Sequence, residues 1–200
     1  MENLNDIYWN NRYTSNDFSW DIGHISPPLK EYIDQLTNKN IKILIPGAGN
    51  SYEAEYLWNQ GFKNVFVLDF AEYPLQNIKI RLPDFPSDQL LKEDFFLHQS
   101  SYDLIIEQTF FCAINPALRS EYVKQMHQLL KPQGKLIGVL FDDVLNDNKP
   151  PFGGNKLEYE KLFSPLFKMA VLDKAYNSIK PRQGRELFFI FEKNDASFLS

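Results

Sequence analysis

Three sites along the chain have the residue types and the spacing needed to bind a nucleoside. Gly47 and Gly49 follow one apolar run, and Asp69 ends a second. Asp94 and Phe95 follow a third. Glycine allows the backbone to approach a ligand closely, and a carboxylate about 20 residues further on can accept both hydroxyl groups of a ribose. Because an acceptor beside an aromatic ring suits the amine and ring of adenine, the three sites together predict adenosine binding.

The residue three positions after Gly49 separates one adenosine cofactor from another. A dinucleotide fold uses Gly-x-Gly-x-x-Gly, whose third glycine allows helix and strand to pack closely beside the pyrophosphate. Tyr52 occupies that position here. Its bulk argues against a nicotinamide dinucleotide and for a nucleoside without phosphates. The N-terminus of the helix that follows would then face a carboxylate.

The three sites come together only if the apolar runs form one parallel sheet. Strands are predicted at residues 41–45, 65–69, 89–92, 102–107 and 135–141. Helices are predicted from a Ser-Pro-Pro start at 26–28 and at residues 51–60, 73–81, 116–130 and 155–163. Asn155 and Glu158 are spaced as a capping box for the last of these helices. Such alternation gives an α/β fold with parallel strands, helices on both faces and ligands at the carboxyl ends of the strands.

Both ends of the chain depart from this alternation. Residues 1–25 are polar and aromatic without a regular period. Residues 169–176 and 185–193 are two further apolar runs without a helix-length gap between them. We expect these two runs to pair as an antiparallel hairpin at the edge of the sheet. Residues 142–154 are rich in Asp, Asn, Pro and Gly and are predicted to form the longest loop.

Composition excludes several classes of partner. The 200 residues suit one domain, and the net charge of −5 comes without a basic stripe that could bind nucleic acid or an anionic membrane. Cys112 is the only cysteine, and His24, His98 and His127 do not have the spacing of metal ligands. The N-terminal residues lack the apolar core of a signal peptide, and no run is long enough to span a bilayer. We expect a cytoplasmic monomer that holds no metal, binds neither nucleic acid nor membrane, and acts on a small molecule.

The order of these motifs resembles the thiopurine S-methyltransferase family, especially its thiol and halide methyltransferases. The most specific match is Thr-Phe-Phe-Cys-Ala-Ile at residues 109–114, followed by Pro116 and Arg119. The other matching segments cover most of the chain and lie at residues 9–13, 20–23 with Pro27, 44–49, 92–95, 102–105, 150–152 and 181–186. The Leu-Lys-Pro-x-Gly-x-Leu junction at residues 130–136 also looks like that of class I methyltransferases.

The resemblance implies a Rossmann-like class I methyltransferase fold. Its single domain would span residues 1–200, with a seven-stranded, mostly parallel sheet, an antiparallel last strand and helices on both faces. The implied cofactor is S-adenosylmethionine, which leaves as S-adenosylhomocysteine. The residues implied to contact it are Trp9, Tyr13, Trp20, Gly47, Ala48, Gly49, Asp69, Asp94, Phe95 and Gln108.

The aromatic residues of segment 1–25 have two open interpretations. From the resemblance they fold over the cofactor as a lid, and a sulfonium cation gains from aromatic faces within about 6 Å. Alternatively, Trp9, Tyr13 and Trp20 only anchor the core. The sequence also departs from the family pattern. Ala48 replaces a common cysteine, and Gln108 stands where relatives often have Tyr or Arg.

The predicted reaction is methyl transfer to a small soft nucleophile: a thiol, a sulfide, a thiopurine-like compound or a halide. An apolar, tight wall rejects strongly hydrated acceptors because it cannot replace their hydrogen bonds to water. Arg182 is the first candidate for the counter-charge to an anionic acceptor and Arg185 the second, unless both are merely paired with carboxylates. The residues predicted to contact the acceptor are Trp20, Phe110, Phe111, Phe152, Arg182 and Arg185.

No residue is assigned as a nucleophile or general base. Methyl transfer from a sulfonium needs no covalent enzyme intermediate, so Cys112 is interpreted as a small buried residue near the pocket. The chain shows no Ser/His/Asp or paired-carboxylate pattern that would indicate hydrolysis. Two rival functions stay open: a catalytically silent protein that binds S-adenosylmethionine or S-adenosylhomocysteine, and a nicotinamide-dependent oxidoreductase, which Tyr52 disfavours.

Overall fold

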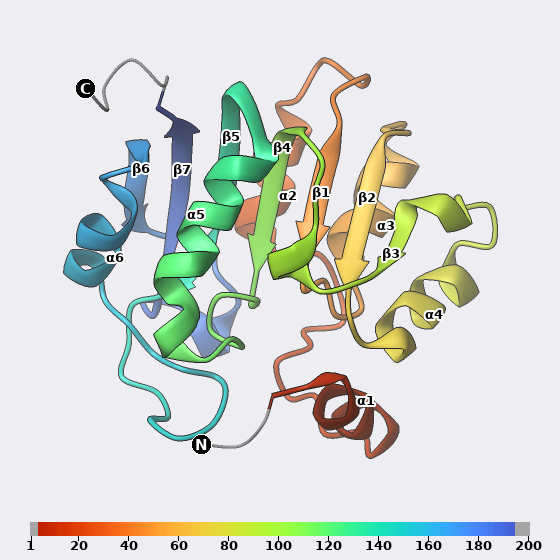
Figure 1. The fold of residues 1–200 in the computed structure, drawn as a ribbon, viewed down its shortest axis with the longest axis horizontal. Helices are drawn as coiled ribbons and strands as arrows, with labels where there is room; N and C mark the ends of the chain where they lie inside the picture. Colours follow the sequence, from red (N-terminus) through yellow and green to blue (C-terminus); the bar gives the residue numbers. More distant parts are fainter. Residues whose placement is uncertain (1–3, 195–200) are drawn as a thin grey trace.

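A computed structural model describes residues 4–194, and its centre is a seven-stranded sheet in the order β3-β2-β1-β4-β5-β7-β6 (Figure 1). The strands are β1 Ile43–Pro46, β2 Val65–Asp69, β3 Leu90–Lys92, β4 Tyr102–Gln108, β5 Leu130–Phe141, β6 Phe167–Lys174 and β7 Glu186–Lys193. The pairs among β1 to β5 are all parallel, and β7 is antiparallel to both β5 and β6. The predicted Rossmann-like class I methyltransferase sheet is therefore confirmed, with β7 inserted between β5 and the edge strand β6.

Helices cover both faces of this sheet, as predicted. The helices are α1 Asp6–Thr14, α2 Pro27–Asp34, α3 Tyr52–Asn59, α4 Glu72–Arg81, α5 Arg119–Leu129 and α6 Lys156–Phe163. Side chains of α2, α3 and α4 share one buried apolar cluster with β1 and β2. Side chains of α5 and α6 share a second cluster with β4, β5 and β7. In Figure 1, α5 and α6 lie in front of the sheet and α2 lies behind it.

Helix α1 was not predicted from the sequence. Asn5 caps its first turn by accepting the N–H of Tyr8 at 2.9 Å. The helix lies beyond the carboxyl ends of β1 and β2 (Figure 1) and docks on α4. There the side chain of Asn10 accepts the N–H of Tyr73 at 3.1 Å, and the rings of Tyr13 and Tyr73 stack at 5.7 Å. Because aromatic contacts rather than an apolar stripe hold it, its sequence shows no helical period. Residues 1–3 of the predicted 1–25 segment lie outside the described residues.

The predicted boundaries are wrong at the junction of α5 and β5. The helix was expected over 116–130 and the strand from 135, but a 3-10 turn occupies Pro116–Leu118 and β5 already begins at Leu130. Leu130 pairs with Tyr102, and its carbonyl accepts the Lys193 ammonium at 2.6 Å. These partners come from distant parts of the chain, so Pro132 and Gly134 interrupt the local pattern without ending the strand.

The predicted capping box of α6 forms only in part. Asn155 accepts the N–H of Glu158 at 3.0 Å, but the Glu158 carboxylate pairs with Arg119 at 2.5 Å. Arg119 also donates to the carbonyl of Gly153 at 2.7 Å, which fixes the end of the predicted loop 142–154. Within residues 4–194, no helix is long and apolar enough to cross a bilayer.

Candidate active site

A cavity of about 550 Å³ lies beyond the carboxyl ends of β1, β2 and β4. That volume is in the range of sites for small molecules, roughly 300–1,000 Å³. Its wall combines the turn after β1, the end of β2, the segment after β3 and the turn after β4 with the N-terminal segment, the loop 142–154 and residues 181–185. Within residues 4–194, no group of three or more His, Cys, Asp or Glu side chains is placed to hold a metal ion.

The turn after β1 needs both of its glycines. Gly47 and Gly49 have φ values of +56° and +52°, a region that side chains disfavour. A Cβ atom on Gly47 would overlap the ring of Phe110, and one on Gly49 would lie 3.0 Å from the hydroxyl of Tyr13. The turn therefore presents bare backbone to the cavity, between two aromatic side chains.

Asp69 brings a buried carboxylate to the cavity at the end of β2. Its Oδ1 accepts the N–H of Ala71 at 2.9 Å. Burial raises the pKa of Asp69 to about 6, although the backbone N–H groups of Ala71, Gly49 and Phe70 oppose that rise. A nearly dry acceptor at this position suits a ribose, because hydroxyl groups can replace the water that it has lost.

Asp94 and Phe95 line the cavity after β3. Asp94 caps the short 3-10 turn Phe95–Leu97 and accepts the N–H of Phe96 at 2.8 Å. The ring of Phe95 is buried and meets the ring of Phe110 edge to face, at 5.1 Å between centroids. The predicted pair of an acceptor and an aromatic face is thus present at the cavity wall.

The N-terminal aromatic residues line the cavity and also pack on one another. Trp20 makes edge-to-face contacts with Trp9 at 5.7 Å and with Tyr13 at 5.8 Å. The guanidinium of Arg12 lies 4.9 Å from the centre of the Trp20 ring. Trp9, Tyr13 and Trp20 were interpreted either as a lid over the cofactor or as anchors of the core. The same contacts fit both interpretations, because these side chains line the cavity and pack on one another.

The turn after β4 is held by Glu107, which the sequence interpretation did not single out. Its carboxylate accepts the N–H groups of Phe110 at 2.7 Å and Phe111 at 2.9 Å, as well as the hydroxyl of Tyr122. Thr109 within the turn has φ of +58°. Burial raises the pKa of Glu107 to about 7. The signal available in the sequence was an acid near the end of a largely apolar strand, Tyr-Asp-Leu-Ile-Ile-Glu.

Four predicted contact residues do not reach the cavity wall. Phe111 and Phe152 were predicted to face the acceptor, but Phe111 packs on Tyr122 and Tyr159 in the core, and Phe152 is buried with its N–H bound to the carbonyl of Cys112 at 2.7 Å. Phe110, their neighbour, does line the cavity. The remaining two are Ala48, which packs against the core cluster of α2 and α3, and Gln108, whose Oε1 is buried without a hydrogen-bond partner among residues 4–194.

Cys112 behaves as the small buried residue that was predicted. It lines the cavity, and its thiol donates to the carbonyl of Thr109 at 3.2 Å. Burial and the nearby charge of Glu107 raise the pKa of Cys112 to about 12. A thiol that stays protonated is a poor nucleophile, so Cys112 contributes apolar wall.

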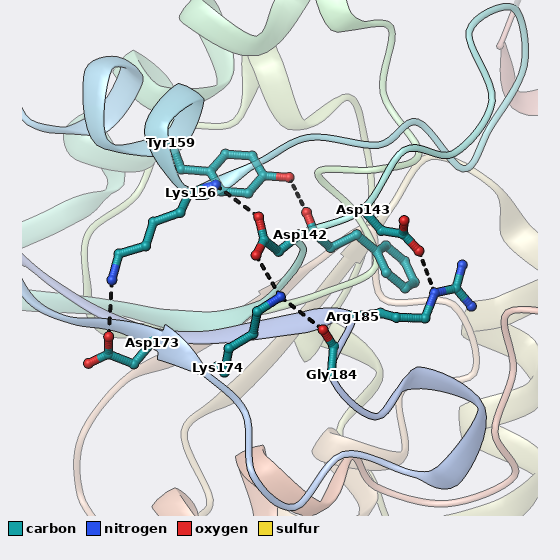
Figure 2. Close-up of polar contacts among 9 residues, drawn as sticks. Asp142, Asp143, Lys156, Tyr159, Asp173, Lys174, Gly184 and Arg185 are labelled. Carbon is teal, nitrogen blue, oxygen red and sulfur yellow. Dashed lines mark hydrogen bonds and ion pairs between the residues drawn. The ribbon is translucent and has the colours of Figure 1, made fainter.

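Arg182 and Arg185 both line the cavity, but each contacts a carboxylate. Arg182 lies 3.3 Å from the buried Glu186 and donates to the carbonyl of Trp20 at 2.5 Å. Arg185 contacts Asp143 at the base of the loop 142–154 (Figure 2). The carboxylate-paired alternative therefore describes both arginines as they stand in this structure.

The comparison with known families finds one match over nearly the whole chain. The profile of the thiopurine S-methyltransferase family matches residues 4–195. A probable thiol methyltransferase 2 of Arabidopsis thaliana is 28% identical over 194 residues, which are 94% of this chain and 85% of that protein. A thiocyanate methyltransferase 1 of Brassica oleracea is 30% identical over 173 residues, 84% of this chain and 76% of that protein.

Solved structures share the fold. A TehB-like methyltransferase dependent on S-adenosylmethionine, from Corynebacterium glutamicum, superposes with a TM-score of 0.65 at 16% identity, covering 94% of this chain and 95% of that chain. A Burkholderia thailandensis 1,6-didemethyltoxoflavin-N1-methyltransferase with bound S-adenosylhomocysteine has a TM-score of 0.73 at 16% identity, covering 95% and 87%. At this identity the likeness concerns the arrangement of helices and strands.

Proposed function

The chain belongs to the thiopurine S-methyltransferase family, and from that premise we propose that it methylates small anionic sulfur or halide acceptors. It is a methyltransferase that depends on S-adenosylmethionine. One observation carries the proposal for the acceptor. The cavity joins the wall of Gly47, Gly49, Asp69, Asp94 and Phe95, which we call the adenosine-type wall, to an apolar wall that holds Arg182 and Arg185. The named activities of the plant relatives, on thiols and thiocyanate, support the same acceptor class.

The residues at the adenosine-type wall fit the cofactor. We assign the turn of Gly47 and Gly49 to the amino-acid portion, Asp69 to the ribose, and Asp94 with Phe95 to the adenine. The buried carboxylate of Asp69 supports this assignment, since it faces the cavity with a raised pKa that ribose hydroxyl groups would offset. When bound, S-adenosylmethionine supplies a methyl group that its sulfonium has already activated.

Tyr52, which argued against a dinucleotide, does not line the cavity. Its hydroxyl lies 3.3 Å from the Oδ2 of Asp21, and its ring lies under the guanidinium of Arg81. A dinucleotide fold has a glycine at this position so that helix and strand pack closely beside the pyrophosphate, and the Tyr52 side chain stands there instead. This packing supports a nucleoside cofactor without phosphates.

The remaining protein contribution is position, desolvation and charge. Phe110, Cys112 and Leu145 supply apolar wall, which removes water from a soft nucleophile before it reacts. A free thiol has a pKa near 8.5, so a positive field at this wall raises its thiolate fraction at neutral pH. Arg185 is the better candidate for that field, because the buried contacts of Arg182 are already satisfied by Glu186 and Trp20.

A methyl-acceptor screen with labelled S-adenosylmethionine tests the proposal. Thiocyanate, hydrosulfide, iodide and 2-mercaptoethanol should accept the methyl group, whereas amines and alcohols should not. Methylation of nitrogen or oxygen acceptors alone would overturn the acceptor class. In a calorimetric titration with S-adenosylhomocysteine, NAD and NADP, only the first ligand should bind, which would exclude the oxidoreductase. Turnover in the acceptor screen would exclude the catalytically silent protein, which would bind the same ligand without turnover.

We also propose a cellular compartment and an oligomeric state for the protein. We propose a monomer in the cytoplasm; the single cysteine, which leaves no intramolecular disulfide to form, supports a reducing compartment. Light scattering of the purified protein and fractionation of the producing cells check these two points. A dimer whose partner side chains enter the cavity would overturn the first.

A further inference from the structure

The arginines at the cavity wall differ in how firmly their carboxylates hold them. Within residues 4–194, the arginines that line the cavity are Arg12, Arg182 and Arg185. The Arg182 and Glu186 side chains are only 10% and 4% exposed. The Arg185 and Asp143 side chains are 47% and 31% exposed. An exposed ion pair exchanges partners readily, whereas breaking a buried pair leaves a charge without compensation.

The backbone around the exposed pair is fixed, so exchange needs only side-chain rotation. Asp143 and Gly154 form reciprocal backbone hydrogen bonds of 3.0 and 3.1 Å across the base of the loop. The carbonyl of Arg185 accepts the N–H of Asp142 at 2.8 Å. These bonds hold the two Cα positions while both charged groups reach solvent.

The neighbouring ion pairs reinforce that frame (Figure 2). The Lys174 ammonium lies 2.6 Å from the Asp142 carboxylate and donates to the carbonyl of Gly184 at 2.8 Å. Tyr159 donates to the carbonyl of Phe141 at 2.6 Å. In Figure 2 the guanidinium of Arg185 points away from the Lys174 contacts, toward Asp143. The side chains of Asp143 and Arg185 can therefore rotate while the backbone at the base of the loop stays in place.

We propose that Asp143 is a specificity-determining residue, whose carboxylate competes with an anionic acceptor for the guanidinium of Arg185. This inference rests on the proposed function, because it presumes an acceptor that carries negative charge. A guanidinium presents its donors as a planar fork, so an anion that takes the place of the Asp143 carboxylate regains the same kind of contact. An uncharged molecule cannot displace the carboxylate and gains nothing from Arg185.

The competition sets the affinity for anions without changing the cofactor site. Asp143 itself does not line the cavity, whereas Arg185 does. Removing the charge of Asp143 leaves the guanidinium with only neutral acceptors, among them the carbonyl of Pro181 at 3.2 Å, so an anionic acceptor meets no charged competitor. Because an exposed pair contributes little, the gain in anion affinity should be roughly two- to fivefold. The affinity for S-adenosylhomocysteine should not change.

The test compares Asp143→Asn with Asp173→Asn, which removes the same charge from a surface pair. Asp173 pairs with Lys156 at 3.0 Å, is 77% exposed and does not line the cavity. Binding of thiocyanate to the complex with S-adenosylhomocysteine is measured by calorimetry, alongside the KM for thiocyanate. Inhibition by methyl thiocyanate, the uncharged product, serves as the neutral reference.

Asp143→Asn should lower the dissociation constant and the KM for thiocyanate two- to fivefold and leave inhibition by methyl thiocyanate unchanged. In an Arg185→Ala background the same substitution should have no effect. Equal effects of the two asparagine variants, or a gain that persists without Arg185, would overturn the role of Asp143. Absence of turnover with every acceptor would overturn the proposed function, while the binding measurement still decides this inference.

Discussion

Substituting the buried Asp69 should change the stability of the ligand-free protein and its affinity for S-adenosylhomocysteine in opposite directions. Burial raises its pKa from 3.8 to about 6. In the ligand-free protein the group therefore favours folding below pH 3.8, and this contribution is lost as pH rises through 6. The difference of about two pKa units corresponds to about 3 kcal/mol at pH 7. Asp69→Asn, which never ionises, should stabilise the ligand-free protein by up to that amount.

Removing the carboxylate of Asp69 should weaken binding of S-adenosylhomocysteine. A hydrogen bond to a charged acceptor contributes about 1.5–3 kcal/mol, so Asp69→Ala, which loses both ribose bonds, should bind at least about a hundredfold more weakly. In the wild type, affinity should be nearly full above pH 7, where about nine carboxylates in ten are ionised. At pH 5 only about one carboxylate in ten is ionised, so affinity should fall about tenfold. Asp69→Asn should show no such dependence on pH.

Denaturant unfolding at pH 7 and calorimetry between pH 5 and 8 measure the two effects. Glu53→Gln is the matched control, because Glu53 is also buried with a raised pKa but does not line the cavity. That variant should keep the dependence of affinity on pH. An Asp69→Asn protein that is less stable than the wild type at pH 7, or a wild-type affinity that is flat from pH 5 to 8, would refute the reasoning.

Three further predictions concern the walls of the cavity. Because burial raises the pKa of Glu107 from 4.5 to about 7, this group should lower wild-type stability by about 2.5 kcal/mol as pH rises from 4.5 to 7, in addition to the contribution of Asp69; in denaturant unfolding across that range, the fall should be smaller by this amount in Glu107→Gln. Hydrogen exchange in residues 4–25 should slow when S-adenosylhomocysteine is added; equal protection would show a fixed arm. Arg182→Ala should destabilise the protein by about 3–5 kcal/mol, because it leaves Glu186 unpaired. Arg185→Ala should change stability by less than about 1 kcal/mol and raise the KM for anionic acceptors. Equal losses of stability in thermal unfolding of the two variants would contradict this ranking.

The sheet could be predicted because its information is local. The run Val65–Asp69 is apolar up to its terminal acid, and it forms β2 with the predicted bounds. The alternation with helices then fixed parallel pairing and the edge at which ligands bind. Helix α1 could not be predicted in this way, because its aromatic residue Tyr13 is held by contacts with Tyr73 and Trp20, which lie outside the helix.

Most of the cavity wall that we propose for the cofactor was predictable for the same reason, and the wall that we propose for the acceptor was not. Gly47, Gly49 and Asp69 follow strands directly, so the strand ends place them. Phe110 and Phe111 lie in a turn bent by the positive φ of Thr109, and one ring enters the cavity while the other enters the core. The sequence interpretation assigned both rings to the acceptor, because the sequence does not show which way such a turn bends.

Two of the carboxylates that the fold keeps buried near the cavity, Asp69 and Glu107, have different roles. Asp69 reaches the cavity, and backbone N–H groups offset only part of the cost of its burial, which a ligand that supplies hydrogen bonds would offset further. Glu107 does not line the large cavity, and its partners are the N–H groups of Phe110 and Phe111 and the Tyr122 hydroxyl. Removing Asp69 should therefore affect affinity first, whereas removing Glu107 should affect the position of Phe110, which lies between the glycine turn and Phe95. A buried acid at a strand end is thus available to a ligand where it faces the cavity, and it supports the next turn where the backbone of that turn supplies its hydrogen bonds.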